Sequence, residues 1–167
     1  GTDITLVGKH PFYKSAVTFS INKSDVVTSV SKSLRDDTYK LFTVKKEIEI
    51  VPNFIEIDKV EIIKKEPCSR SLLAKETEKV ITHISNFRKV KRIEDVVHIF
   101  YKIQKETPAK LMMVGDGPEK EKAERLCIEL NIHEKVIFFG NSNEIDKILC
   151  YTDLFLLPSE TESFGLA

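Results

Sequence analysis

Residues 79–100 read KVITHISNFRKVKRIEDVVHIF, and this stretch decides the fold that we predict. It opens on an apolar run of strand length, VITHI at 80–84, and continues into four cations within five residues. Apolar residues then recur at helical spacing and form one face of a helix, made of Ile93, Val96, Val97, Phe100 and Ile103. Strand, cationic turn and amphipathic helix, in this order, make the first part of a βαβ unit.

Strand-like runs and helical segments keep alternating further along the chain. The apolar runs are KLMMV at 110–114, VIFF at 136–139 and LFLL at 154–157. Two helical segments separate them: one has a face made of Ala123, Leu126, Cys127 and Leu130, and a shorter one runs from about Glu144 to Cys150. Because the strands are apolar on both faces and are joined by helices, we predict a parallel sheet covered on both sides, with right-handed crossovers.

The beginning of the chain shows a second α/β pattern. The β-branched run DVVTSV at 25–30 precedes Ser31 and Ser33, either of which suits the cap of a helix. That helix has Leu34, Thr38, Leu41 and Phe42 on one face, and EIEIVPNFI at 47–55 then alternates like a strand. Residues 56–76 are charged and aperiodic, so we place a domain boundary near Lys59 to Pro67.

Composition narrows the possible classes of function. Lys plus Arg and Asp plus Glu both total 26, so no overall charge favours nucleic acid or an anionic membrane. Apolar runs stay far below the roughly 20 residues of a membrane span, and no signal-peptide pattern opens the chain, so we expect a cytoplasmic protein. Cys68, Cys127 and Cys150 form no CxxC pair and have no histidine at ligand spacing, and we expect neither a zinc site nor disulfides.

Ligands of parallel α/β sheets bind outside the carboxyl ends of the strands, so the residues after each strand are informative. These segments are SNFRKVKR at 85–92, GDGPE at 115–119, GNSNE at 140–144 and PSETESFG at 158–165, and we expect them along one rim. The histidines do not pair with Ser, Cys or Asp at the spacing of a catalytic triad. We therefore expect structural or solvated roles for His83, His98 and His133.

The first of these segments suggests an anion site. It places Arg88, Lys89, Lys91 and Arg92 between a strand and the start of a helix. A cation there is mildly unfavourable, because the helix macrodipole is already positive at that end. A phosphate or diphosphate would offset this and accept from backbone N–H groups and a guanidinium together. A solvated basic loop stays open as the alternative.

Two other rim segments carry weaker signals. Gly115 and Gly117 suit a tight turn, but Lys120 stands where the dinucleotide fingerprint needs a third glycine, which favours a turn and helix start over an NAD site. Glu160 and Glu162 could accept hydrogen bonds from sugar hydroxyls, or could simply begin a helix.

Taken together, the motifs resemble the retaining GT-B glycosyltransferases of family four. They appear in the family's order over essentially the whole chain, as SDVVTSVSKSLRDD, VPNFI, ISNFRKVKR, GDGPE, VIFFG and PSETESFGLA. The resemblance implies an α/β chain containing parts of two Rossmann-like domains with parallel sheets. Residues 1–60 would be the C-terminal part of the acceptor-side domain, 61–66 a linker, and 67–167 the N-terminal part of the nucleotide-sugar domain.

The resemblance also implies roles for individual residues. Arg88 and Lys91 would hold the donor diphosphate, although the family's usual spacing between this Arg and Lys is longer by two residues. Glu162 matches the first glutamate of the EX7E motif, which contacts the transferred sugar. The remaining positions are Gly165 and Leu166, offering backbone N–H groups to phosphate, and Thr2 and Asp3, near the acceptor.

The forms GTDIT, VPNFI and ISNFRKVKR resemble more narrowly the members that transfer N-acetylglucosamine from UDP to the hydroxyl of L-malate in bacillithiol synthesis. This resemblance implies UDP-N-acetylglucosamine and L-malate as partners, and neither a cofactor nor a metal. Three alternatives stay open: a different hexosyl acceptor, a UDP-sugar epimerase of the same fold, and a non-catalytic nucleotide-binding fragment.

The ends of the chain suggest an internal piece of a longer protein. It opens at Gly1 without Met and stops at Ala167, before position 170, where the second glutamate of EX7E would fall. We therefore expect little or no transferase activity from these residues alone. Exposed sheet edges would also favour self-association, so a homo-oligomer is possible.

Overall fold

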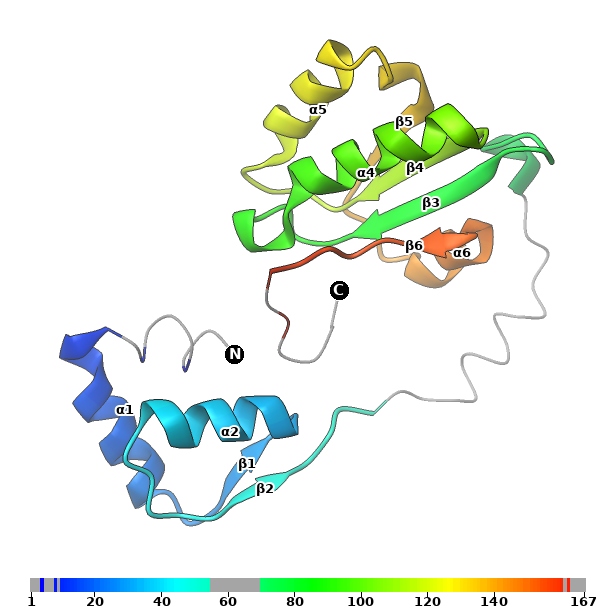
Figure 1. The fold of residues 1–167 in the computed structure, drawn as a ribbon. Coiled ribbons are helices and arrows are strands. Elements are labelled where there is room, and N and C mark those ends of the chain that lie inside the picture. Colours follow the sequence, from blue (N-terminus) through cyan, green and yellow to red (C-terminus); the bar gives the residue numbers. More distant parts are fainter. Residues whose placement is uncertain (1–3, 5–7, 9, 55–69, 161, 163–167) are drawn as a thin grey trace. The chain divides into compact units, whose positions relative to one another are not determined.

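The computed structural model describes residues 4, 8, 10–54, 70–160 and 162 (Figure 1). The chain forms two compact units, one that includes residues 10–54 and one that includes residues 70–160. Both have the α/β architecture that the sequence predicts, with parallel strands. The predicted boundary at 59–67 and the predicted linker at 61–66 lie outside the described residues, so the domain limits stay a prediction.

The first unit is a small βαβ segment preceded by a helix. Its elements are α1 (Pro11–Lys23), β1 (Val27–Ser29), α2 (Lys32–Leu41) and β2 (Ile48–Ile50). The two strands pair in parallel, with Val27 opposite Ile48. Of the two serines considered, Ser31 caps α2, since its side chain accepts a hydrogen bond from the Leu34 N–H at 3.2 Å.

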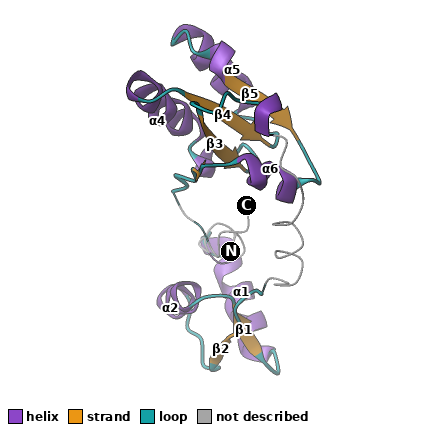
Figure 2. Cartoon of the chain, turned by 90° about the vertical axis from the view of Figure 1, so that its right-hand side faces the viewer, coloured by secondary structure: helices purple, strands orange, loops and turns teal. Residues whose placement is uncertain are grey.

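The second unit has a four-stranded parallel sheet in the order β5-β4-β3-β6 (Figure 2). The strands are β3 (Lys79–Ile84), β4 (Ala109–Val114), β5 (Val136–Gly140) and β6 (Leu154–Phe155). The helices are α4 (Ile93–Glu106), α5 (Lys120–Glu129) and α6 (Ile145–Tyr151), with 3-10 turns at Arg70–Leu72, Lys89–Lys91 and His133–Lys135. This confirms the alternation predicted from the apolar runs.

Both faces of this sheet are covered, as expected for strands that are apolar on both sides. One face packs against α4 and α5, burying Ile81, Leu111 and Met113 against Val97 and Phe100, among others. The other face packs against α6 and buries Ala74, Val80, Ile84, Met112, Val114 and Ile148. The predicted inner face of α4 is confirmed, with Ile103 half-buried at its end.

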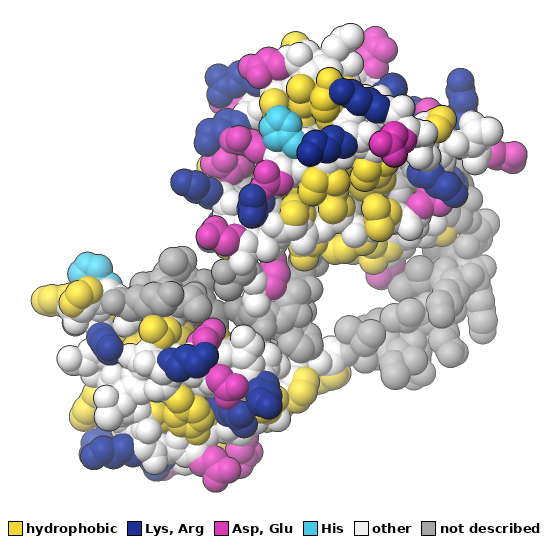
Figure 3. Space-filling model, viewed as in Figure 1, with side chains coloured by type: hydrophobic (Ala, Val, Ile, Leu, Met, Phe, Trp, Pro, Cys, Tyr) yellow, Lys and Arg dark blue, Asp and Glu magenta, His cyan; other side chains and the backbone are white. Residues whose placement is uncertain are grey.

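The last strand is shorter than the run LFLL predicts. Only Leu154 and Phe155 pair with β3, and both are largely exposed, at 48% and 41%. Figure 3 shows apolar side chains gathered along the side of the unit where β6 runs. β6 has a hydrogen-bonded neighbour on one side only among the described strands, so it receives little burial to extend the pairing.

Two expectations from composition have different outcomes. Within the part of the chain that the structure describes, every helix is too short or too polar to span a bilayer.

Cys127 is a free thiol in the core, and burial, helped by the Glu124 carboxylate, raises its pKa to about 11. Cys150 is disulfide-bonded, so our expectation of three thiols is wrong for this residue. Spacing along a sequence cannot show which distant cysteines a fold brings together.

Candidate functional site

The cationic turn lies at the carboxyl end of β3, directly before α4. After β3 the backbone stays tied to β4, with Ser85 N–H donating to Val114 O at 3.0 Å. Phe87 is completely buried and anchors the turn in the core. Arg88 and Lys91 then belong to one tight 3-10 turn, closed by a hydrogen bond from Lys91 N–H to Arg88 O at 2.8 Å.

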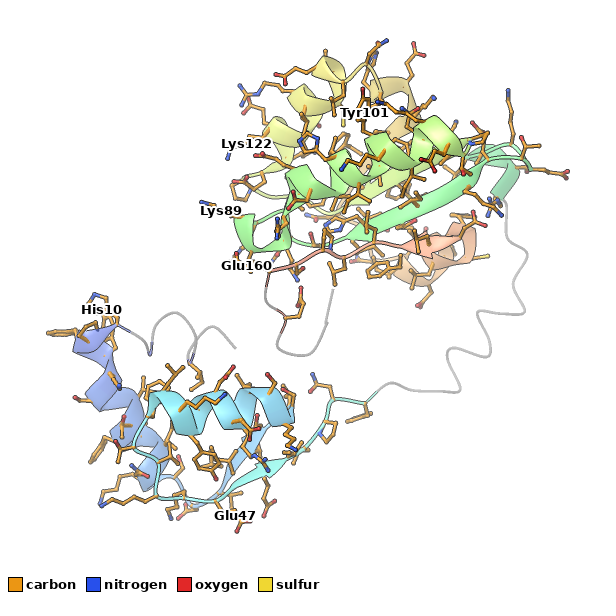
Figure 4. All side chains as sticks on the ribbon, viewed as in Figure 1. His10, Glu47, Lys89, Tyr101, Lys122 and Glu160 are labelled. Carbon is orange, nitrogen blue, oxygen red and sulfur yellow. The ribbon has the colours of Figure 1, made fainter. Side chains whose placement is uncertain are left out.

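The cations of this turn differ in what they contact. Arg92 forms an ion pair with Asp95 in the first turn of α4. Arg88 and Lys89 are exposed, and within the described residues their charged groups have no acidic partner. Arg88 is thus available to an anion, whereas the charge of Arg92 is already balanced. Figure 4 shows Lys89 and Glu160 at the same end of the unit.

The loop after β4 presses closely on the backbone of this turn. A Cβ atom on Gly115, whose φ is +124°, would lie 1.8 Å from Ser85 O. One on Gly117, at φ +156°, would lie 2.7 Å from Phe87 O, and the Glu119 N–H donates to the same carbonyl at 3.0 Å. The predicted turn is confirmed, and the two glycines are also needed because side chains there would push the cationic turn away.

Hydrogen bonds join the remaining rim segments to these two. Gly115 N–H donates to Gly140 O at 2.8 Å, which places the end of β5, where the segment GNSNE begins, beside GDGPE. Glu160 N–H donates to Val90 O at 2.9 Å, which places the segment after β6 against the cationic turn. The expectation that the four segments share one rim is therefore confirmed for their described residues.

His83 is the least expected feature of the rim. It is fully buried in β3, with Nδ1 2.8 Å from Leu156 O and Nε2 2.7 Å from the Ser85 hydroxyl. Burial is the main cause that lowers its pKa; the hydrogen bond to Leu156 opposes the shift and nearby Lys91 adds to it. We predicted a structural or a solvated role, and the structure shows a structural one; the sequence gave no sign that Ser85 and Leu156 would be its partners.

The other predicted site residues are grouped with the first unit or lie outside the described residues. Glu162 is exposed and falls outside the unit that carries Arg88. Gly165, Leu166, Thr2 and Asp3 lie outside the described residues. Among the residues that are described, no group of three His, Cys, Asp or Glu side chains could hold a metal ion. Absence of a metal requirement stays a prediction.

Comparison with known proteins decides the family. The family model described as glycosyl transferases group 1 matches residues 64–167. The chain belongs to this family. It is also 45% identical to the N-acetyl-alpha-D-glucosaminyl L-malate synthase of Bacillus anthracis, over 99% of this chain and 44% of that protein.

Solved structures confirm the GT-B fold that the resemblance implied. The chain superimposes on Anabaena HepE, solved in complex with UDP-glucose, with a TM-score of 0.76 and 15% identity, over 96% of this chain and 45% of HepE. It superimposes on WaaG, a glycosyltransferase involved in lipopolysaccharide biosynthesis, with a TM-score of 0.73 and 19% identity, over 95% of this chain and 46% of WaaG. The chain thus spans less than half the length of the proteins it matches.

Proposed function

We propose that the whole protein, meaning the natural polypeptide in which this chain occurs, is a retaining glycosyltransferase of the cytoplasm. It moves N-acetylglucosamine from UDP-N-acetylglucosamine to the hydroxyl of L-malate, the first step of bacillithiol synthesis. The 45% identity to a relative named for this product supports the substrates. The observation that carries the mechanism is the exposed cationic turn at the carboxyl end of β3.

The turn would act on the leaving group. In the reaction the bond from the anomeric carbon to the UDP oxygen breaks, and a bond to the malate oxygen forms on the same face of the sugar. Negative charge develops on the diphosphate, so cations placed beside it stabilise the transition state more than the ground state. Arg88 can form two parallel hydrogen bonds to phosphate oxygens, and Lys91 adds a point charge from the same turn.

The remaining roles follow the family resemblance. Glu162 contacts the transferred sugar, while the backbone N–H groups of Gly165 and Leu166 bind phosphate. Thr2 and Asp3 lie near the acceptor. The departing phosphate takes the proton of the malate hydroxyl, so neither a separate base nor a metal is required.

The test is an assay of the whole protein with UDP-N-acetylglucosamine and L-malate, following N-acetylglucosaminyl malate by mass spectrometry. Arg88→Ala should lower kcat/KM by about 100-fold or more, because it removes a charged donor from the leaving group. Arg125→Ala is the matched control: it is an exposed arginine on α5, paired with Glu121 at 3.7 Å, and should leave turnover unchanged.

Other products would point to the alternatives. Malate-independent conversion of the donor would identify an epimerase, and glycosylation of another hydroxy compound would change the acceptor. UDP binding without any turnover would leave a non-catalytic nucleotide-binding protein. Equal loss of activity in Arg88→Ala and Arg125→Ala would remove the proposed role of the turn.

A further inference from the structure

The protonation state of His83 follows from its two partners. A carbonyl oxygen can only accept, so Nδ1, at 2.8 Å from Leu156 O, carries the ring proton. Nε2 is then an acceptor in the neutral ring, and the Ser85 hydroxyl donates to it at 2.7 Å. The Leu156 carbonyl therefore fixes the tautomer, the hydrogen bond with Ser85 helps to fix the orientation of the imidazole, and the imidazole holds a carbonyl 73 residues away.

That carbonyl lies where the pairing of β6 with β3 ends. The strand pairing stops at Phe155, and Leu156 N–H still donates to Thr82 O at 2.8 Å. The chain is next tied at Glu160, whose N–H donates to Val90 O at 2.9 Å in the cationic turn. His83 thus holds one end of the segment 156–160, and the cationic turn holds the other.

The path of this segment has to be imposed by such contacts. Ser159 within it has a buried hydroxyl without a hydrogen-bond partner in the described structure. Burying an unpaired hydroxyl is unfavourable, so the contacts at the two ends of the segment are needed to hold this path. The contacts at Leu156 and Glu160 keep it in place despite this cost.

We propose that His83 is a positioning residue for the donor site: by holding Leu156, it fixes segment 156–160 against the cationic turn. The inference rests on the function proposed above, because it assigns segment 156–160 and the cationic turn to the donor site. A histidine that merely fills the core would affect stability alone.

Three variants of the whole protein separate these roles. His83→Phe keeps a ring of similar size but loses both hydrogen bonds, and should lower kcat/KM for the donor by about 10- to 100-fold. His83→Asn places an amide N–H near the position of Nδ1, can again donate to Leu156 O, and should recover most of the loss. Ser85→Ala leaves Nε2 without its donor and should give an intermediate value. His98→Phe, which alters an exposed histidine of α4, is the control.

Hydrogen exchange tests the same contact without relying on turnover. The Glu160 amide should exchange faster in His83→Phe and stay protected in His83→Asn. If wild-type protein transfers no sugar to malate, the proposed function fails, and this exchange difference still decides the positioning contact. Unchanged exchange in His83→Phe, or an Asn variant as impaired as the Phe variant, would overturn the inference.

Discussion

Arg92 has an unfavourable backbone conformation at the position where the cationic turn ends and α4 begins. Its φ of +54° lies in the left-handed region, which costs a residue with a Cβ about 1–2 kcal/mol. Its ion pair with Asp95 compensates only partly, because exposed pairs contribute about 0–1 kcal/mol. The sharp change of direction after Lys91 is therefore imposed by the packing on both sides, including buried Phe87 and Ile93.

This cost can be measured by comparing two substitutions. Arg92→Gly and Arg92→Ala both remove the ion pair, but only glycine adopts the left-handed conformation without penalty. We expect Arg92→Gly to be the more stable of the two by about 1 kcal/mol, a difference of a few degrees in Tm. Lys89→Gly and Lys89→Ala are the control, because Lys89 is not at positive φ. There the alanine variant should be the more stable, and the same order at both positions would contradict the explanation.

At the scale of single elements, β6 is fixed at its start by a charged contact. Arg70 donates to the Asp153 carboxylate at 2.6 Å and to Glu78 O at 2.6 Å, and the same carboxylate accepts from Val80 N–H at 2.7 Å. The hydrogen bond from Arg70 is the main cause that lowers the pKa of Asp153; burial opposes it. β6 has only two residues paired with β3, and the contacts of Asp153 thus stabilise its position in the sheet.

Asp153→Asn should destabilise the unit at neutral pH by about 1–2 kcal/mol, after allowance for the partial exposure of both side chains. Folding lowers the pKa of Asp153. The stabilisation that its carboxylate provides is therefore complete above the ordinary aspartate pKa of about 3.9, and it is lost as pH falls through the pKa of the folded state. Urea unfolding at a series of pH values should show the variant and wild type converging in acid. Asp25→Asn, which replaces an exposed aspartate of the first unit, is the control for the substitution itself. If the difference in unfolding free energy between wild type and Asp153→Asn persists in strong acid, the charge of Asp153 is not its cause.

Elements with a strong local pattern were predictable. β3 and β4 are apolar on both faces, and α4 has four buried residues on one side, so the sequence alone indicated them. α1 was not predicted, since no residue of this helix is buried in the structure and its apolar residues follow no single face. Only half of LFLL forms a strand, because strand length depends on neighbours that the run itself does not reveal.

At the scale of the whole molecule, the missed features depend on residues distant in sequence. The parallel fold predicted a shared rim, and the hydrogen bonds of Gly115 and Glu160 confirm it. The bond from His83 to Leu156 and the approach of Gly115 to Ser85 join separate βα units, and no periodicity reports such contacts. The roles given to Arg88, Lys91 and Glu162 come from family resemblance and stay predictions.

The proposed transferase activity depends on the whole protein and not on one element or residue. The relative named N-acetyl-alpha-D-glucosaminyl L-malate synthase is matched over only 44% of its length, and transfer between two substrates needs donor and acceptor held at one place. In these 167 residues β6 also leaves Leu154 and Phe155 largely exposed, which favours association between copies. We therefore expect these residues, produced alone, to release no UDP above background with N-acetylglucosamine donor and malate, and to sediment as concentration-dependent oligomers. The whole protein, assayed in parallel, should be active. Malate-dependent UDP release by the 167 residues alone would show that the chain already contains both binding sites.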